Sequence, residues 1–164
     1  MADTTKLVVF TDGACAGNPG PGGWAAILQY GEHEKVLQGG ASLTTNNRME
    51  LRAAIAAFQA LTRPCAVEVH TDSEYLRRGI TEWLVTWQRN GWRTASKDPV
   101  ENMDLWNELL AAVQPHQIMW KKVKGHADDA LNNLCDKLAR KQITDRIKAV
   151  AKEGEGAKSV EASS

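Results

Sequence analysis

Two valine-rich runs, far apart in the sequence, end in the same dipeptide. Residues 7–13 close on Thr11-Asp12 and residues 66–73 close on Thr71-Asp72. The unbroken apolar run at the start of the first segment is typical of a strand buried on both faces of a sheet, and the second segment is again rich in residues that favour strands. If the two strands lie parallel and adjacent, both aspartates reach the same carboxyl edge, where open α/β sheets bind their ligands. Because two carboxylates there would repel each other, the pattern predicts a divalent cation between them.

Length and composition are those of one compact domain. The chain has 164 residues with a formal net charge of +0, and a domain of this size buries about two thirds of its unfolded surface. We place the domain at residues 1–143 and expect residues 144–164, which lose the apolar period, to form a disordered tail. The cysteines are odd in number and match neither a zinc site nor a disulfide framework. With no apolar run near the roughly 20 residues of a membrane span, we expect a cytoplasmic monomer that does not bind membranes.

The segment after the first strand predicts a loop and a hairpin. Residues 17–23 are so rich in Gly and Pro that we expect a shaped loop. Its glycines are either ordinary turn residues or a place where the backbone approaches a phosphate or sugar. Residues 24–30 and 35–39 then predict two strands joined by a short turn, continuing antiparallel from the first strand.

Apolar residues at helical spacing predict a helix over residues 51–61, and Glu50 stands at its start. Two interpretations of Glu50 are open at this level. With Asn47 as the N-cap, Glu50 would be the acid of a capping box. With Thr45 as the N-cap, it would lie in the second turn on the border of the buried stripe, where an acid needs a partner.

Basic residues alternate with tryptophans between residues 74 and 103, where we expect a helix, in two pieces broken near Gly79, and then a turn. Arginine binds phosphate and indole packs on sugar or base, so the pattern is one that a surface following a nucleic-acid backbone would need. The alternative is a solvated helix with a Trp-rich core contact. Further along, the patterns predict a helix over 103–113, a strand over 117–123 and a last helix beginning near residue 128.

Several motifs, taken together and in order, resemble the bacterial type 1 ribonuclease H family. They lie at residues 10–23, 44–50, 71–73, 91–92, 120–126 and 135–136, and the resemblance spans about residues 6–141. It implies a ribonuclease H-like α/β fold with a five-stranded mixed sheet, three antiparallel then two parallel strands, flanked by helices. The implied activity is that of an endonuclease, which hydrolyses the RNA strand of RNA/DNA hybrids and leaves 3′-hydroxyl and 5′-phosphate ends.

The resemblance also implies site residues. Asp12, Glu50, Asp72 and Asp136 would be the metal-binding catalytic carboxylates, which replaces the capping-box interpretation of Glu50. The loop residue His126, otherwise best explained by a surface or capping role, would assist proton transfer or product release. The implied cofactor is Mg²⁺, as two ions with substrate bound, with Mn²⁺ as an alternative. The implied contacts to the hybrid are Gly13, Cys15, Asn18, Thr45, Asn46, Asn47, Glu74, Trp83, Trp87, Arg89, Trp92 and Arg93.

The chain departs from the family pattern at two places. Gln88 and Asn90 flank Arg89 where relatives carry more lysine, and residues 128–131 replace a common Gly-His-Pro-Glu. Because each lost phosphate contact removes about one unit of salt dependence, we expect hybrid binding that is weaker and less salt-sensitive. Two other functions would share many of these features: a non-catalytic hybrid-binding module, and a transposase or integrase core.

Overall fold

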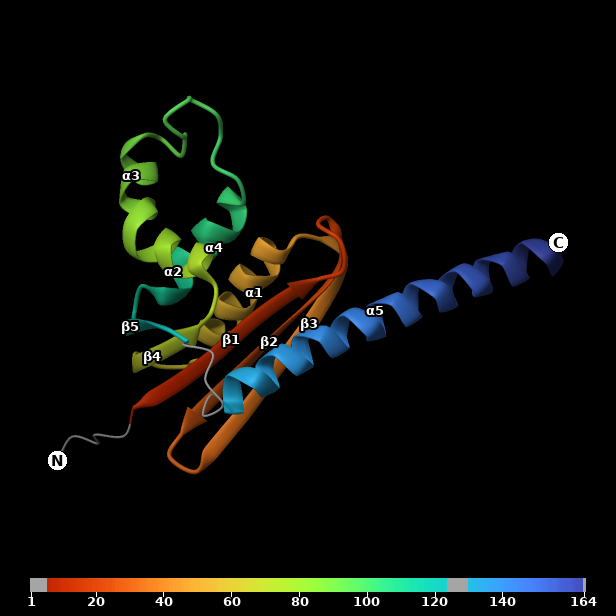
Figure 1. Cartoon of the computed structure of the whole chain (residues 1–164), viewed down its shortest axis with the longest axis horizontal. Coiled ribbons are helices and arrows are strands. Elements are labelled where there is room, and N and C mark those ends of the chain that lie inside the picture. Colours follow the sequence, from red (N-terminus) through yellow and green to blue (C-terminus); the bar gives the residue numbers. More distant parts are fainter. Residues whose placement is uncertain (1–5, 124–129, 164) are drawn as a thin grey trace.

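A five-stranded sheet forms the centre of the molecule (Figure 1). The computed structural model describes residues 6–123 and 130–163, with side chains left out for residue 150 and residues 153–163. The strand order is β3-β2-β1-β4-β5. The strands are β1 (Leu7–Cys15), β2 (Gly20–Tyr30), β3 (His33–Thr44), β4 (Ala66–Thr71) and β5 (Gln117–Lys122).

The pairing confirms the predicted mixed sheet. β1, β2 and β3 pair antiparallel, whereas β4 pairs parallel with both β1 and β5. In the β1–β4 register Thr11 lies opposite Thr71. The residue after each threonine, Asp12 or Asp72, therefore reaches the same edge of the sheet.

Helices cover both faces of the sheet (Figure 1). Successive side chains of a strand point to opposite faces, so Val9 packs with α1 (Asn46–Gln59) in one core cluster while Phe10 packs against α5 (Ala130–Ser163) in another. The main core therefore lies between the sheet, α1 and α4. The helices are α1 (Asn46–Gln59), α2 (Glu74–Arg78), the π-helical η1 (Gly79–Trp83), α3 (Leu84–Arg89), α4 (Met103–Val113) and α5 (Ala130–Ser163).

The glycine-rich segment is less of a loop than the sequence predicts. β2 begins at Gly20, so the loop between β1 and β2 is limited to residues 16–19. A Cβ on Gly22 would lie 2.4 Å from the Thr44 side chain, and one on Gly23 would lie 2.1 Å from the Ala139 carbonyl oxygen of α5. The prediction of a loop over 17–23 was therefore right for residues 17–19 and wrong from Gly20 onward, where the glycines admit close packing on a strand.

The predicted break near Gly79 is a single π-helical turn inside a continuous helical segment, η1 between α2 and α3. A Cβ on Gly79 would lie 2.1 Å from the ring of Trp106, which is fully buried on α4. Glycine at this position allows the helix to pack directly on the indole. π-Helical turns are rare and occur mostly as single turns inside α-helices, as here.

α5 leaves the sheet and continues as a helix to Ser163, away from the rest of the molecule (Figure 1). Ala, Lys and Arg favour helix, but a helix without tertiary contacts is marginal in water. The disordered tail over 144–164 therefore stays a prediction. None of the helices in the described parts of the chain has the length and apolar character needed to span a membrane.

Candidate active site

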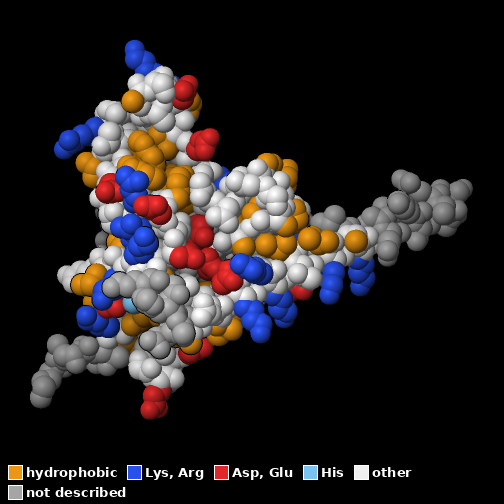
Figure 2. Space-filling view, in the orientation of Figure 1, with side chains coloured by type: hydrophobic (Ala, Val, Ile, Leu, Met, Phe, Trp, Pro, Cys, Tyr) orange, Lys and Arg blue, Asp and Glu red, His pale blue; other side chains and the backbone are white. Residues whose placement is uncertain are grey.

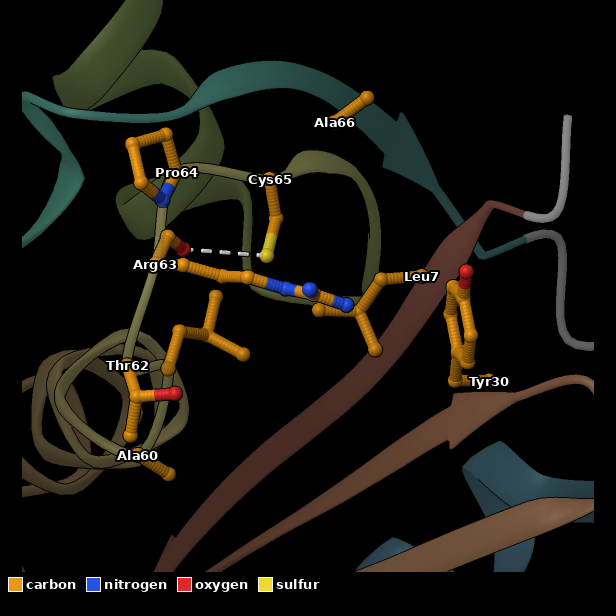
Figure 3. A pocket seen from close by; sticks show the side chains of 9 residues that line it. Leu7, Tyr30, Ala60, Thr62, Arg63, Pro64, Cys65 and Ala66 are labelled. Carbon is orange, nitrogen blue, oxygen red and sulfur yellow. Dashed lines mark hydrogen bonds between the residues drawn. The ribbon is translucent and has the colours of Figure 1, made fainter. Parts of the chain in front are cut away.

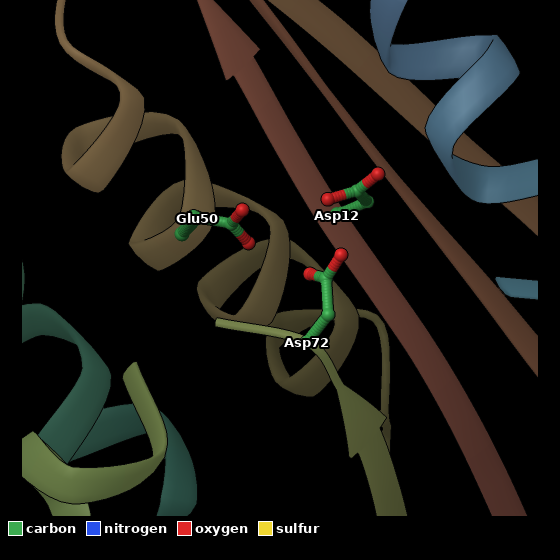
Figure 4. A group of neighbouring side chains, drawn as sticks. All are labelled: Asp12, Glu50 and Asp72. Atoms are coloured by element: carbon green, nitrogen blue, oxygen red, sulfur yellow. The ribbon is translucent and has the colours of Figure 1, made fainter. Parts of the chain in front are cut away.

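Three carboxylates from separate elements meet at the edge where β1 and β4 end (Figure 4). Asp12 lies on β1, Asp72 follows β4, and Glu50 projects from α1. One oxygen of each lies within 4.8 Å of the others. The three side chains point toward a common centre, as the parallel strand ends predict for the two aspartates.

The start of α1 explains how Glu50 reaches this centre. Thr45 is the N-cap, and its hydroxyl accepts a hydrogen bond of 3.2 Å from the Arg48 N–H. Glu50 therefore lies in the second turn, and the capping box with Asn47 does not form. A Cβ on Gly13 would lie 2.4 Å from the Glu50 backbone nitrogen. Glycine after Asp12 is what allows α1 to approach β1 closely enough to place Glu50 beside it.

Burial sets the electrostatics of the cluster. The exposed fraction is only 3% for Asp12 and 4% for Glu50. Desolvation, followed by repulsion from Asp72, raises the pKa of Asp12 from 3.8 to about 8. Desolvation and repulsion from Asp12 and Asp72 raise the pKa of Glu50 well above its ordinary value. The pKa of Asp72 is also raised, chiefly by desolvation.

The buried oxygens of this cluster are incompletely satisfied. The Gly13 N–H donates a 3.0 Å hydrogen bond to Oδ1 of Asp12. Among the residues that the structure describes, Oδ2 of Asp12 and Oε2 of Glu50 are buried without a hydrogen-bond partner. Buried carboxylate oxygens are costly unless they are paired or bind a metal. A hard divalent cation with oxygen ligands, such as Mg²⁺, fits this donor set.

Asp136, on α5, lines the same pocket from the opposite side. Its carboxylate adds to the like charges acting on Asp12, and it is paired with Arg140, one turn later, at 3.1 Å. It is held there because Cys135 and Ala139 are fully buried against the sheet. Asp136 is outside the group of three described above, and its side chain is 41% exposed.

The pocket has a volume of about 620 Å³ and gathers several of the predicted substrate contacts. Gly13, Cys15, Asn46, Asn47 and Glu74 line it together with the four carboxylates. Asn18 lies beside them, because its side-chain oxygen accepts a 3.1 Å hydrogen bond from the Asn46 N–H. Thr45 joins this rim as the N-cap of α1.

The remaining predicted contacts lie on a protrusion built by η1, α3 and the following loop, away from the pocket (Figure 1). Its tryptophans pack on one another, with ring centroids 5.8 Å apart for Trp83 and Trp87 and 6.4 Å apart for Trp87 and Trp92. The Trp-rich contact that the sequence left as an alternative is therefore present. All three rings stay partly exposed, and Arg89 and Arg93 are exposed. Binding of DNA by this protrusion stays a prediction.

The sequence predicted one site residue that lies outside the described part of the chain, and it did not predict one residue that lines the pocket. The predicted catalytic His126 lies outside the described residues. Arg140, which lines the pocket, was missed by the sequence analysis. Its position four residues after Asp136 was the available signal, because residues at this spacing are neighbours on a helix.

A second hollow lies at the other end of β1 and has a volume of about 530 Å³ (Figure 3). Leu7, Tyr30 and Pro64 line it, with Arg63 and Cys65 beside them. None of its lining residues is a carboxylate, so it lacks the metal-binding chemistry of the first pocket.

Comparison with known proteins identifies relatives along almost the whole chain. The family model for RNase H matches residues 4–144. The ribonuclease H of Chromohalobacter salexigens is 56% identical over 151 residues, covering 92% of each chain. The crystal structure of LC9-RNase H1, a type 1 RNase H with the type 2 active-site motif, has a TM-score of 0.78 at 32% identity, covering 89% of this chain and 75% of that one. LC11-RNase H1, crystallised with an RNA/DNA hybrid, shares the fold with a TM-score of 0.62 at 21% identity, covering 87% and 99%.

Proposed function

The chain belongs to the ribonuclease H family and is therefore a nuclease; we propose that it hydrolyses the RNA strand of RNA/DNA hybrids with two divalent metal ions held by Asp12, Glu50, Asp72 and Asp136. The products would carry 3′-hydroxyl and 5′-phosphate ends. Relatives crystallised with RNA/DNA hybrids support this substrate. The metal we propose is Mg²⁺, with Mn²⁺ able to replace it.

The observation that carries the metal proposal is the cluster of three carboxylates with two unpartnered buried oxygens. Without a cation, burial and repulsion raise the pKa of Asp12 to about 8, so this carboxyl group keeps its proton near neutral pH, and the same causes raise the pKa of Glu50. A bound divalent cation would take the place of this proton and would be coordinated by the buried carboxylate oxygens that have no hydrogen-bond partner among the described residues. When bound, the ions supply a nucleophilic water near neutral pH and stabilise charge on the attacking and leaving oxygens.

The chain's own residues would orient this chemistry. The Gly13 N–H fixes one oxygen of Asp12 and leaves the other directed into the pocket. Asp12 and Asp72 sit on rigid strand ends, and Glu50 is held by the packing of α1 on β1. Such preorganised ligands do not have to be reordered when the substrate arrives. We also propose that His126 assists proton transfer or product release.

Discrimination between RNA and DNA would depend on the 2′-hydroxyl, the group that distinguishes the two strands at every nucleotide. The backbone of residues 13–16 and the Glu50 carboxylate line the pocket in which the RNA strand would lie. Asn18, Asn46 and Asn47 offer amide groups at the same rim. We therefore propose that these groups read the sugar and the backbone, which leaves little sequence preference.

Two features support a monomeric enzyme of the cytoplasm. All four carboxylates come from one chain, so no second copy is needed to complete the pocket. Cys15, Cys65 and Cys135 are free thiols, which suits a reducing compartment.

The test is cleavage of a 5′-labelled RNA/DNA hybrid beside the matching RNA and DNA duplexes, in Mg²⁺ and in EDTA. The wild-type protein should cut the RNA strand of the hybrid, in the presence of Mg²⁺ alone. Asp12→Asn should abolish cleavage, because it removes the most central ligand of the cluster. Glu34→Gln, at an exposed position of β3, is the matched control and should cut normally.

The other outcomes separate the alternatives. Retention of the hybrid without any cutting would contradict the nuclease and favour a hybrid-binding module. Cutting of the DNA duplex would favour a transposase or integrase core. Full activity in EDTA, or in Asp12→Asn, would refute the metal mechanism.

A further inference from the structure

The part of α5 that borders the pocket and leads away from it carries an excess of positive charge. The whole chain has 20 Lys and Arg against 20 Asp and Glu, whereas residues 136–152 alone contain six Lys and Arg against two Asp. Four of these cations form what we call the lysine ridge. They are Lys137, Lys141, Lys148 and Lys152.

The lysine ridge occupies one face of the helix. Its members follow one another at separations of four, seven and four residues, so at about 100° per residue they lie within about 60° of each other. The opposite side of α5 packs on the sheet through the fully buried Cys135 and Ala139. All four lysines are exposed. Within the described parts of the chain, none of the four forms an ion pair.

The ridge is continuous with the candidate active site. Arg140 and Ile143, on the same helix, line the pocket, and Arg140 is paired with Asp136 through Nε. Figure 2 shows Lys and Arg side chains along α5, beginning beside the acidic cluster and following the helix outward. The structure describes α5 as helix through Lys152, and the proposal requires residues 144–152 to be helical, not disordered, when the hybrid is bound. From Lys137 to Lys152 the helix rises about 22 Å. At about 3.4 Å per phosphate, this matches six or seven nucleotides of one strand.

We propose that the lysine ridge binds the sugar-phosphate backbone of the RNA/DNA hybrid where the duplex leaves the pocket. The inference rests on the proposed function, because the hybrid must occupy the pocket for its flank to reach α5. A nucleic-acid backbone fits the ridge because both are rows of like charge with regular spacing. Lysines without acidic partners can release the counterions of phosphates on contact, which favours binding.

The ridge also offsets the weakly basic protrusion. There, Arg93 donates a 2.9 Å hydrogen bond to the Lys97 carbonyl oxygen, and Asp98 and Glu101 follow in the chain. The shallow salt dependence expected from the sequence therefore applies to the protrusion alone. Contacts from α5 add to the total salt dependence of binding to a long hybrid.

The test compares hybrids of two lengths by binding in Ca²⁺, without cleavage, over a range of salt concentrations. One hybrid has about 8 base pairs and fills the pocket only, and the other has about 20 and reaches along α5. The ridge variant combines Lys141→Gln, Lys148→Gln and Lys152→Gln; Lys137 is kept because it adjoins Asp136. The slope of log affinity against log salt is negative. On the long hybrid its magnitude for the ridge variant should be smaller than for the wild type by about 2 to 3. On the short hybrid the two slopes should agree.

Two matched variants complete the experiment. Lys6→Gln, Lys35→Gln and Arg63→Gln remove the same charge from other exposed positions and should keep the wild-type slope on both hybrids. Replacing the three ridge lysines by arginine should restore the slope. An unchanged slope of the ridge variant on the long hybrid would overturn the proposal, leaving an acidic protein as partner of this face. The proposal would also be overturned if the ridge variant lost the same amount of slope on both hybrids, or if the control variant lost as much slope as the ridge variant. A wild-type protein that binds neither hybrid would contradict the proposed function itself.

Discussion

Replacing Asp12 by Asn should stabilise the metal-free protein, even though it removes activity. In the wild type the folded state holds the Asp12 carboxyl, 3% exposed, beside two further acids. Asparagine has nearly the same shape without the charge. Its amide can also donate to a neighbouring carboxylate, which an ionised Asp12 cannot do.

The size of the effect follows from the pKa of Asp12, raised from 3.8 to about 8 on folding. A pKa raised on folding gives stability that is complete below the unfolded value and is lost as pH rises through the folded value. The wild type therefore loses stability between about pH 4 and pH 8, at about 1.36 kcal/mol for each unit. At pH 7 this amounts to about 4 kcal/mol. Residual structure in the unfolded chain typically changes such a difference by a few tenths of a kcal/mol, so we expect Asp12→Asn to be about 3 to 4 kcal/mol more stable at pH 7.

Urea unfolding in EDTA at pH 5, 7 and 8.5 measures this directly. The advantage of the variant should be smallest at pH 5 and should level off above pH 8. Added Mg²⁺ should then stabilise the wild type more than the variant. A ligand that binds the folded state stabilises it, and the variant lacks one of the proposed metal-binding carboxylates. A variant that is less stable than the wild type, or whose advantage does not grow with pH, would refute the reasoning.

Three further substitutions test other parts of the structure. Asp136→Asn should abolish cleavage yet change metal-free stability by less than about 1 kcal/mol, because Asp136 is 41% exposed and paired with Arg140; a gain as large as that of Asp12→Asn in the same urea assay would contradict this. Tyr75→Phe should lower the free energy of unfolding by about 1 to 3 kcal/mol. The Tyr75 hydroxyl oxygen accepts hydrogen bonds from Trp106 Nε1 at 3.0 Å and from the Asn102 side chain at 3.1 Å, and without it the indole N–H would be buried and unpaired. An unchanged melting temperature would show that the indole finds another acceptor. Gly79→Ala should cost about 1 to 3 kcal/mol by overpacking, because its Cβ would lie 2.1 Å from the Trp106 ring; stabilisation, the usual result of replacing glycine in a helix, would refute the close contact.

Much of the fold was predictable from local patterns. The valine-rich runs marked β1 and β4, and the spacing of apolar residues marked α1 and α4. The Thr-Asp ends placed Asp12 and Asp72 at one edge once the strands were taken as parallel neighbours. The five-stranded mixed sheet was predicted from the family resemblance, because local patterns do not specify which strands pair.

The site itself was only partly predictable. On sequence grounds Glu50 had two interpretations, and the choice depends on the contact between Gly13 and α1, which joins segments far apart in the chain. Arg140 was missed because its role depends on where α5 crosses the sheet. For the three tryptophans the sequence left two interpretations open, a nucleic-acid surface and a Trp-rich packing contact, and the structure shows that their rings pack on one another.

The sequence by itself determined the elements and the residue types of the site, because strand and helix patterns and the preference of Mg²⁺ for carboxylates are properties of short segments. Only the tertiary structure decided that Asp12 and Glu50 are buried beside Asp72 with unpartnered oxygens, and that the helix carrying the lysine ridge borders the pocket. Burial and proximity arise when distant segments pack together. This burial and proximity raise the pKa of Asp12 and bring the lysine ridge next to the pocket, and neither effect can be read from a single segment of the sequence.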